Sequence, residues 1–167
     1  MRRLVLPALL LALAISVGAG DDAAGAAAST AGNGAVQVTL QLAATTVTSG
    51  SVLSGRLTIV NGSHKPIRYV TCGSFIQILL RNHDHLLSPG WLLCSAPLTL
   101  PTGTSSYPVS VVAAYNECAP TGAWGTHVAC LRSGGMPPLP PGVYQATTYL
   151  VPAVPVPPPI TITVTAG

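Results

Sequence analysis

The sequence predicts an all-β protein folded as a sandwich of two antiparallel sheets. Apolar and polar residues alternate along several short segments, which is the pattern of a half-buried strand. Glycine, proline, serine and asparagine separate these segments. No apolar repeat of about 3.6 residues, which would indicate an amphipathic helix, occurs beyond the N-terminal apolar run.

Seven segments have the character of strands. In the first, valine and leucine at the even positions from Val36 to Leu42 alternate with glutamine and threonine. The second follows a Ser-Gly-Ser turn and ends at Asn61-Gly62, a dipeptide that favours tight turns. Asn61-Gly62-Ser63 also fits the N-glycosylation sequon, although a hairpin turn is the simpler interpretation. The expected strands cover residues 36–42, 53–61, 67–70, 75–80, 107–115, 143–151 and 160–165.

The turn before the penultimate segment refines the predicted fold. Pro140-Pro141-Gly142 supplies the turn, and Tyr144 stands at the start of the strand. Immunoglobulin-like sandwiches place a tyrosine corner at such a position, with the hydroxyl bonded to backbone a few residues upstream. We therefore expect a single immunoglobulin-like antiparallel β-sandwich of about seven strands, with structural roles for Gly142 and Tyr144. A plain half-buried tyrosine is the alternative.

Two long loop regions, both bearing cysteine, interrupt the strands at residues 81–100 and 116–141. Loops of this length are usually functional or cross-linked. The segment 151–159, which reads VPAVPVPPP, predicts a stiff polyproline II stretch. We favour a rigid connection over a proline-rich ligand using the P-x-x-P spacing of Pro152 and Pro155.

The N-terminus has the three parts of a secretory signal peptide: an arginine pair, an apolar run from Leu4 to Val17, and small residues. The run is shorter than the 18 or so apolar residues of a membrane anchor. Cleavage is expected after Ala19, so we expect a secreted or extracytoplasmic envelope protein without stable membrane insertion. The expected organisation is a signal peptide over 1–19, a flexible Gly/Ala-rich spacer over 20–35 and one domain over 36–167.

Four cysteines in an exported chain indicate two disulfides, because oxidising compartments preserve them. Their spacings match no C-x-x-C zinc motif. Three pairings are possible, and the sequence does not choose among them. We favour Cys72 with Cys94 and Cys118 with Cys130, since each bond then closes a loop between neighbouring elements.

Charged residues make up only 7% of the chain. Without the two leader arginines, 5 basic and 4 acidic residues leave a net charge of +1, too little to neutralise a run of nucleic-acid phosphates. Asp84 and Glu117 are the only carboxylates of the predicted domain, and neither a G-x-S-x-G nor an H-E-x-x-H motif occurs. We therefore expect no nucleic-acid binding, no cofactor and no enzymatic activity.

One histidine pair is a candidate metal site. His83 and His85 are two positions apart, so on a strand they would share a face and could chelate a divalent metal. His64 or His127 could complete such a site. A solvated polar turn is the interpretation we favour for this segment.

Three segments, Leu57–Ile67, Phe75–Gln77 and Pro141–Tyr144, resemble the immunoglobulin-like domain of the BsuPI type, a family named for a bacterial proteinase inhibitor. The layout is also similar to uncharacterised secreted actinobacterial immunoglobulin-like proteins, through the T-x-x-Y-P-V strand Thr104–Val109 and the M-P-P-L-P-P-G-x-Y segment Met136–Tyr144. A GC-rich bacterial source agrees with the single lysine and the abundance of alanine, glycine and proline. The resemblance implies the fold more than an activity, because the cysteines and the second long loop depart from the inhibitor pattern.

The expected function is that of an exported, non-catalytic module acting in binding or structure at the bacterial cell envelope, with an envelope protein or glycan as partner. Loops on a rigid scaffold carry function in such folds, so Trp91 and Trp124 are candidate contact residues, or they pack over the disulfides. A secreted proteinase inhibitor that presents the constrained loop 116–130 is one alternative. Divalent metal binding through His83 and His85 is the other.

Overall fold

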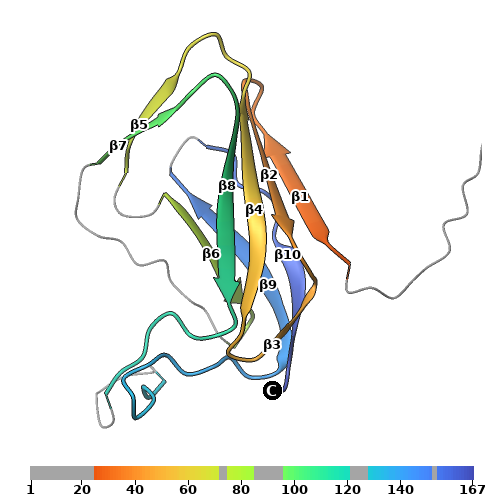
Figure 1. Cartoon of the computed structure of the whole chain (residues 1–167), viewed down its shortest axis with the longest axis vertical. Helices are drawn as coiled ribbons and strands as arrows, with labels where there is room; N and C mark the ends of the chain where they lie inside the picture. Colours follow the sequence, from red (N-terminus) through yellow and green to blue (C-terminus); the bar gives the residue numbers. More distant parts are fainter. Residues whose placement is uncertain (1–24, 72–74, 85–95, 121–127, 152–153) are drawn as a thin grey trace, which may run out of the picture.

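The computed structural model is a β-sandwich, which confirms the predicted all-β class (Figure 1). It describes residues 25–71, 75–84, 96–120, 128–151 and 154–167, and these ranges contain ten strands and no helix. The strands are β1 (Ala27–Gly32), β2 (Val36–Leu42), β3 (Thr46–Thr48), β4 (Val52–Asn61), β5 (Ile67–Thr71), β6 (Ile76–Arg81), β7 (Ala96–Leu100), β8 (Gly103–Val112), β9 (Gly142–Leu150) and β10 (Ile160–Thr165).

The first sheet has the strand order β1-β2-β4-β8, and all its pairs are antiparallel. The alternation of β2 explains its place in the sheet, because its four valines and leucines are buried while its glutamines are exposed. β4 and β8 form the longest ladder, which runs from Val52↔Val112 to Asn61↔Gly103.

The second sheet has the order β3-β10-β9-β6. The short strand β3 runs parallel to β10, and the other pairs are antiparallel. Its interior side chains, among them Tyr144, Ile162 and Val164, pack with those of the first sheet in one apolar core. Burial of these two apolar faces is the main source of stability in such a sandwich.

The strand order is that of an immunoglobulin-like sandwich. In that scheme β2, β4 and β8 take the places of strands A, B and E, while β6, β9 and β10 take those of C, F and G. Strand D would lie outside β8, but no described strand does. Instead β7 pairs with β5 in a separate two-stranded ribbon, so β8 is left as an edge.

Ten strands rather than about seven are present, because β1, β3 and β7 were not expected. The spacer predicted over 20–35 is wrong for Ala27–Gly32, since all six residues of β1 pair with β2. The side chains of β1 are mostly alanine, serine and threonine, so they give little contrast between an apolar and a polar face. Backbone pairing and half-burial against β2 nevertheless hold the segment as a strand.

Asn61 fixes the junction between the long β4–β8 ladder and the β5–β7 ribbon. Its side chain is buried, and its Nδ2 lies 3.2, 3.3 and 3.2 Å from the carbonyl oxygens of Lys65, Leu100 and Pro101. Its Oδ1 accepts hydrogen bonds from the backbone N–H and the hydroxyl of Ser63. The amide of the sequon asparagine is therefore engaged inside the fold, in agreement with its interpretation as a turn residue.

The proline-rich connection between β9 and β10 packs one side on the core. Val151, Val154, Pro157 and Ile160 are buried, whereas Val156 is exposed. Burial at every third residue is the period of a polyproline II helix, which has three residues per turn. The described part of this segment thus agrees with a rigid connection. Residues 152–153 lie outside the described residues, so the P-x-x-P ligand interpretation stays untested.

Among the residues that the structure describes, no helix is both long enough and apolar enough to cross a membrane.

Candidate binding site

Among the strands that the structure describes, β6 and β8 are sheet edges, and they lie next to each other on one side of the sandwich (Figure 1). Two connected hollows occupy this side, and we call them together the seam. The upper hollow is lined by residues 75–79 and 107–110. The lower hollow is lined by Ile78, Leu79, Leu80, Ser110, Val112, Ala114, Tyr115, Asn116 and Met136.

The upper hollow has a volume of about 530 Å³ and an aromatic end. The rings of Phe75 and Tyr107 meet edge to face with their centroids 5.0 Å apart. Such a pair contributes about 0.5–1.5 kcal/mol beyond its buried area, so it fixes this end of the hollow. Ile78 and Val109 continue the apolar wall from the two opposing strands.

The lower hollow, of about 240 Å³, extends the seam toward the base of the second long loop. Ile78, Leu79 and Ser110 line both hollows, so the seam is continuous. Val112 and Met136 at its lower end are 47% and 45% exposed. The lower end of the seam therefore exposes apolar side chains, while Phe75, Tyr107 and Val109 of the upper hollow are half-buried.

The outward-facing edge of β8 is interrupted by a proline. The Ala113 N–H donates to the Ser51 carbonyl, and the Gly50 N–H donates to the Ala113 carbonyl. Because bonded and outward-facing residues alternate along a strand, the odd-numbered residues of β8 bond to β4 and the even-numbered residues face the free edge. Pro108 is one of the outward-facing residues and has no N–H, so the edge lacks a donor near its middle.

The edge of β6 has no such interruption. The Thr163 N–H donates to the Thr45 carbonyl, which turns the odd-numbered residues of β10 toward β3. The even-numbered residues of β10 therefore bond to the even-numbered residues of β9, and the odd-numbered residues of β9 bond to the odd-numbered residues of β6. The backbone N–H and C=O groups of Ile78 and Leu80 consequently face the free edge. Their side chains point into the core, where they are 7% and 0% exposed. β6 therefore has the backbone chemistry to accept another strand.

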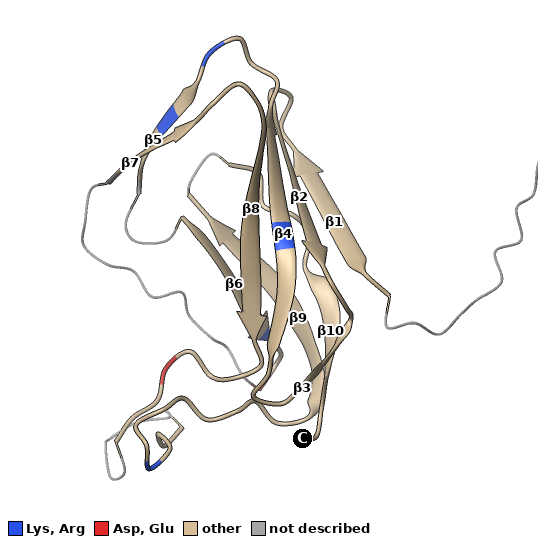
Figure 2. Ribbon diagram, in the orientation of Figure 1, with Lys and Arg blue, Asp and Glu red and all other residues tan. Residues whose placement is uncertain are grey.

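The seam carries no charge at neutral pH. None of the residues that line its two hollows is a lysine, arginine, aspartate or glutamate. Figure 2 shows the basic residues of the described part dispersed over the molecule, among them Arg56 on β4, Arg68 on β5 and Arg81 at the end of β6. Arg56 donates to the hydroxyl of Ser106 on the outer face of the first sheet. The seam can thus hold an uncharged apolar group.

Tyr144 lies at the start of β9 with the geometry of a tyrosine corner. Its side chain is 1% exposed, and its hydroxyl donates to the carbonyl of Pro140 at 2.9 Å. Burial raises the pKa of Tyr144 above its usual 10.0, and the negative charges of Tyr115 and Asp84 add to this shift. Gly142 precedes it in β9 and pairs with Val164 of β10.

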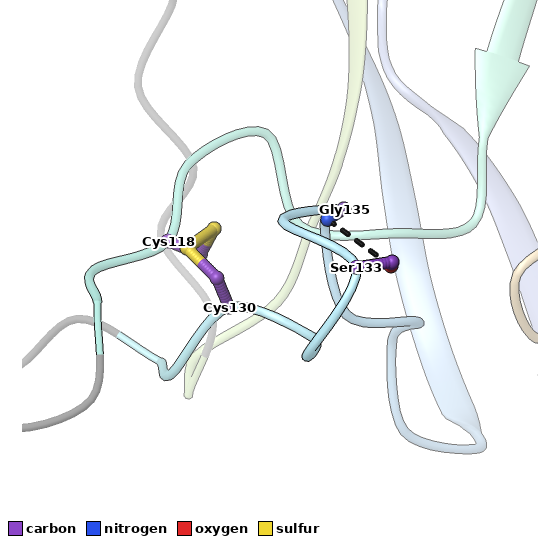
Figure 3. Close-up of a disulfide and its surroundings, with 4 residues drawn as sticks. All are labelled: Cys118, Cys130, Ser133 and Gly135. Atoms are coloured by element: carbon purple, nitrogen blue, oxygen red, sulfur yellow. Dashed lines mark hydrogen bonds between the residues drawn. A yellow bond between two sulfur atoms is a disulfide. The ribbon is translucent and has the colours of Figure 1, made fainter.

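The disulfide Cys118–Cys130 is present, which confirms that pairing (Figure 3). The two Cα atoms are 5.0 Å apart and the bond spans 12 residues. Two backbone bonds accompany it, from Ala119 N–H to the Val128 carbonyl and from Cys130 N–H to the Ala119 carbonyl. Just beyond it, Ser133 and Gly135 are linked by a hydrogen bond of 3.4 Å within the next turn.

The base of this loop is fixed to the sandwich. The Tyr115 N–H donates to the Pro137 carbonyl, and the Leu139 N–H donates to the Ala113 carbonyl. Leu139 itself is fully buried, and its carbonyl accepts a hydrogen bond from the Ser49 hydroxyl at 2.6 Å. The loop therefore leaves and re-enters the fold at one defined place.

The histidine segment forms an exposed polar turn in its described part. His83 Nδ1 lies 3.1 Å from Asp84 Oδ1, and both side chains are largely exposed. The Asp84 N–H donates to Asn82 Oδ1, which closes the turn. Within the described ranges no three histidine, cysteine or acidic residues come together as a metal site. The following residues lie outside the described ranges: Cys72, Cys94, Trp91, Trp124, His85 and His127.

Sequence reasoning did not identify the seam. The sequence places Phe75 and Tyr107 on expected strands and in the segments that carry the resemblance, but nothing in it brings the two rings together. Pro108 was a usable signal, because proline inside a strand pattern indicates an edge. The partner edge β6 carries no comparable signal.

Comparison with protein-family models, with curated proteins and with solved structures gives no match to this chain.

Proposed function

We propose that the protein is an exported, non-catalytic immunoglobulin-like module that binds a protein partner in the bacterial cell envelope through the seam. The observation that carries this proposal is the continuous, uncharged and apolar opening between β6 and β8. Exposed apolar surface of this kind marks interaction sites in soluble proteins. The signal-peptide pattern and the Cys118–Cys130 disulfide support a site of action outside the cytoplasm.

A capture experiment with paired variants tests the proposal. The mature domain is immobilised and exposed to envelope extract, alongside Leu79→Lys in the seam and Thr163→Lys on the outer face of β10 in the same sheet. Leu79 borders both hollows, so a lysine there would place a charge at their rim, whereas the exposed Thr163 lines neither hollow. We expect a protein that the parent and Thr163→Lys retain and that Leu79→Lys loses. Equal capture by all three, or no capture, would count against the seam as the binding site.

Proteinase inhibition is a second candidate function, favoured by the second long loop. The loop is closed by a disulfide and anchored at its base, so a protease would meet a chain that is already constrained. Inhibition assays against a panel of secreted proteases test this candidate. Nanomolar to micromolar inhibition that is lost in Cys118→Ser/Cys130→Ser would support it, and the absence of inhibition would leave the seam proposal alone.

A further inference from the structure

The edge of β6 differs from the other side of the seam in what it can bind. β8 presents Pro108 at its outward-facing edge, so a strand added there would lose one backbone hydrogen bond. β6 has neither proline nor a charged residue at its outward-facing positions, and the backbone groups of Ile78 and Leu80 face the opening. An incoming strand therefore meets no proline on β6 and can pair there with the backbone groups of Ile78 and Leu80.

From this asymmetry we infer that the partner of the seam is an extended, uncharged polypeptide segment that adds to β6 as a further strand. This inference rests on the proposed function and specifies the ligand class. Addition of a peptide strand to a free sheet edge uses main-chain hydrogen bonds for affinity and pockets for alternate side chains for specificity. Both features are present, because the two hollows lie beside the edge that offers the backbone groups.

The dimensions and the charge of the site set the chemistry of the segment. The six residues of β6 span about 20 Å, which matches a strand of about six residues. Side chains on one face of the added strand would enter the hollows, whose lining is uncharged and mostly aliphatic and aromatic. A lysine or glutamate placed there would lose its hydration without gaining a partner. The segment should therefore alternate apolar side chains with polar, uncharged ones.

Selection from a random peptide display library on the folded mature domain tests this inference. We expect the selected peptides to be uncharged with alternating apolar positions, and to lose binding to Leu79→Lys but not to Thr163→Lys. Binding should slow hydrogen exchange at the Ile78 and Leu80 amides by about tenfold or more, and leave the Ser106 and Ser110 amides of β8 unchanged. Methylating alternate amide nitrogens of a selected peptide should abolish binding in one of the two alternating sets only, because only one set faces β6.

Three results of these experiments would overturn the inference, and a fourth comes from the capture experiment. One is failure to select any peptide, and another is protection of β8 or β1 in place of β6. The third is a concentration-dependent dimer in sedimentation analysis with the Ile78 and Leu80 amides already protected, which would make a second copy of the chain the occupant. An envelope protein captured through the seam without slower exchange at these two amides would refute strand addition while leaving the proposed function intact. Peptides that add to β6, together with failure to capture any envelope protein, would support strand addition and count against the proposed function.

Discussion

The tyrosine corner should stabilise the protein at neutral pH and less so at alkaline pH. Tyr144→Phe should remove both this stabilisation and its dependence on pH. Tyr144 is buried, and its hydroxyl donates a hydrogen bond to the carbonyl of Pro140. Tyr144→Phe removes this bond and keeps the buried ring. A hydrogen bond of this kind contributes about 0.5–1.5 kcal/mol, and Pro140 is exposed enough for water to replace the donor. We therefore expect Tyr144→Phe to lower the free energy of unfolding by about 1 kcal/mol at pH 7.

The pH dependence follows from the direction of the pKa shift. The pKa of Tyr144 is raised in the folded protein, first by burial and then by the charges of Tyr115 and Asp84. Well below the pKa of the unfolded chain, about 10, both states hold the proton and the stabilisation is complete. Above it the unfolded chain releases the proton first, so the free energy of unfolding falls, with a limiting slope of about 1.4 kcal/mol per pH unit. The advantage of the parent over Tyr144→Phe should shrink above pH 10.

Urea denaturation of the parent and Tyr144→Phe at intervals from pH 7 to pH 11, followed by circular dichroism, measures this difference. Ionisation of every other group occurs in both proteins and cancels in the comparison. The buffers contain no thiol, so that Cys118–Cys130 stays oxidised. A difference that stays constant or grows up to pH 11 would refute the assignment of a raised pKa to Tyr144. No difference at pH 7 would refute the stabilising role of the corner.

Three further predictions concern the packing of the sandwich, each measured as a change in the free energy of unfolding. Asn61→Ala should cost about 2 kcal/mol, since it leaves carbonyl groups at a buried junction without a donor; a cost below 0.5 kcal/mol would contradict this role. Gly55→Ala should cost about 1–3 kcal/mol, because its Cβ would lie 2.6 Å from a backbone oxygen, whereas Gly32→Ala, with no atom nearer than 3.5 Å, should be neutral. Equal effects of the two alanines would argue against the close contact. Thr148→Val should stabilise by about 1 kcal/mol, since the Thr148 hydroxyl is buried without a partner among the described residues, while Thr163→Val on the surface should change little. A loss of stability in Thr148→Val would show that the hydroxyl has a partner.

The sequence predicts those strands whose two faces differ in polarity. β2, β4 and β10 appear close to their expected places, because aliphatic side chains alternate in them with polar ones. β1 has no such contrast, and β3 is only three residues long, so neither produces a readable pattern. The Pro-Gly turn followed by tyrosine was a stronger signal, because it combines turn chemistry with a position on a strand.

The seam could not be predicted from the sequence, for a different reason. It exists because β7 pairs with β5 and leaves the outer edge of β8 free. Alternation along one strand reports which face is buried, but it does not report which strand lies next to it. The same limit applies to disulfides, where pairing depends on distance in space and the sequence left three possibilities open. Cys118–Cys130 agrees with the favoured pairing, while Cys72 and Cys94 lie outside the described residues.

The low charge of the chain gives the edge of β6 its significance. The outer face of the first sheet stays polar through hydroxyl groups, for example in the cross-strand row formed by Thr30, Thr39, Thr58 and Ser106. Sheet edges are normally protected by charged side chains or proline, since an open edge invites pairing with other chains. β8 has such protection in Pro108, but β6 combines an open backbone edge with an uncharged apolar opening. An unprotected edge of this kind is a liability in an isolated domain and an advantage in one that receives a strand from its partner, which is why we assign the binding site to β6.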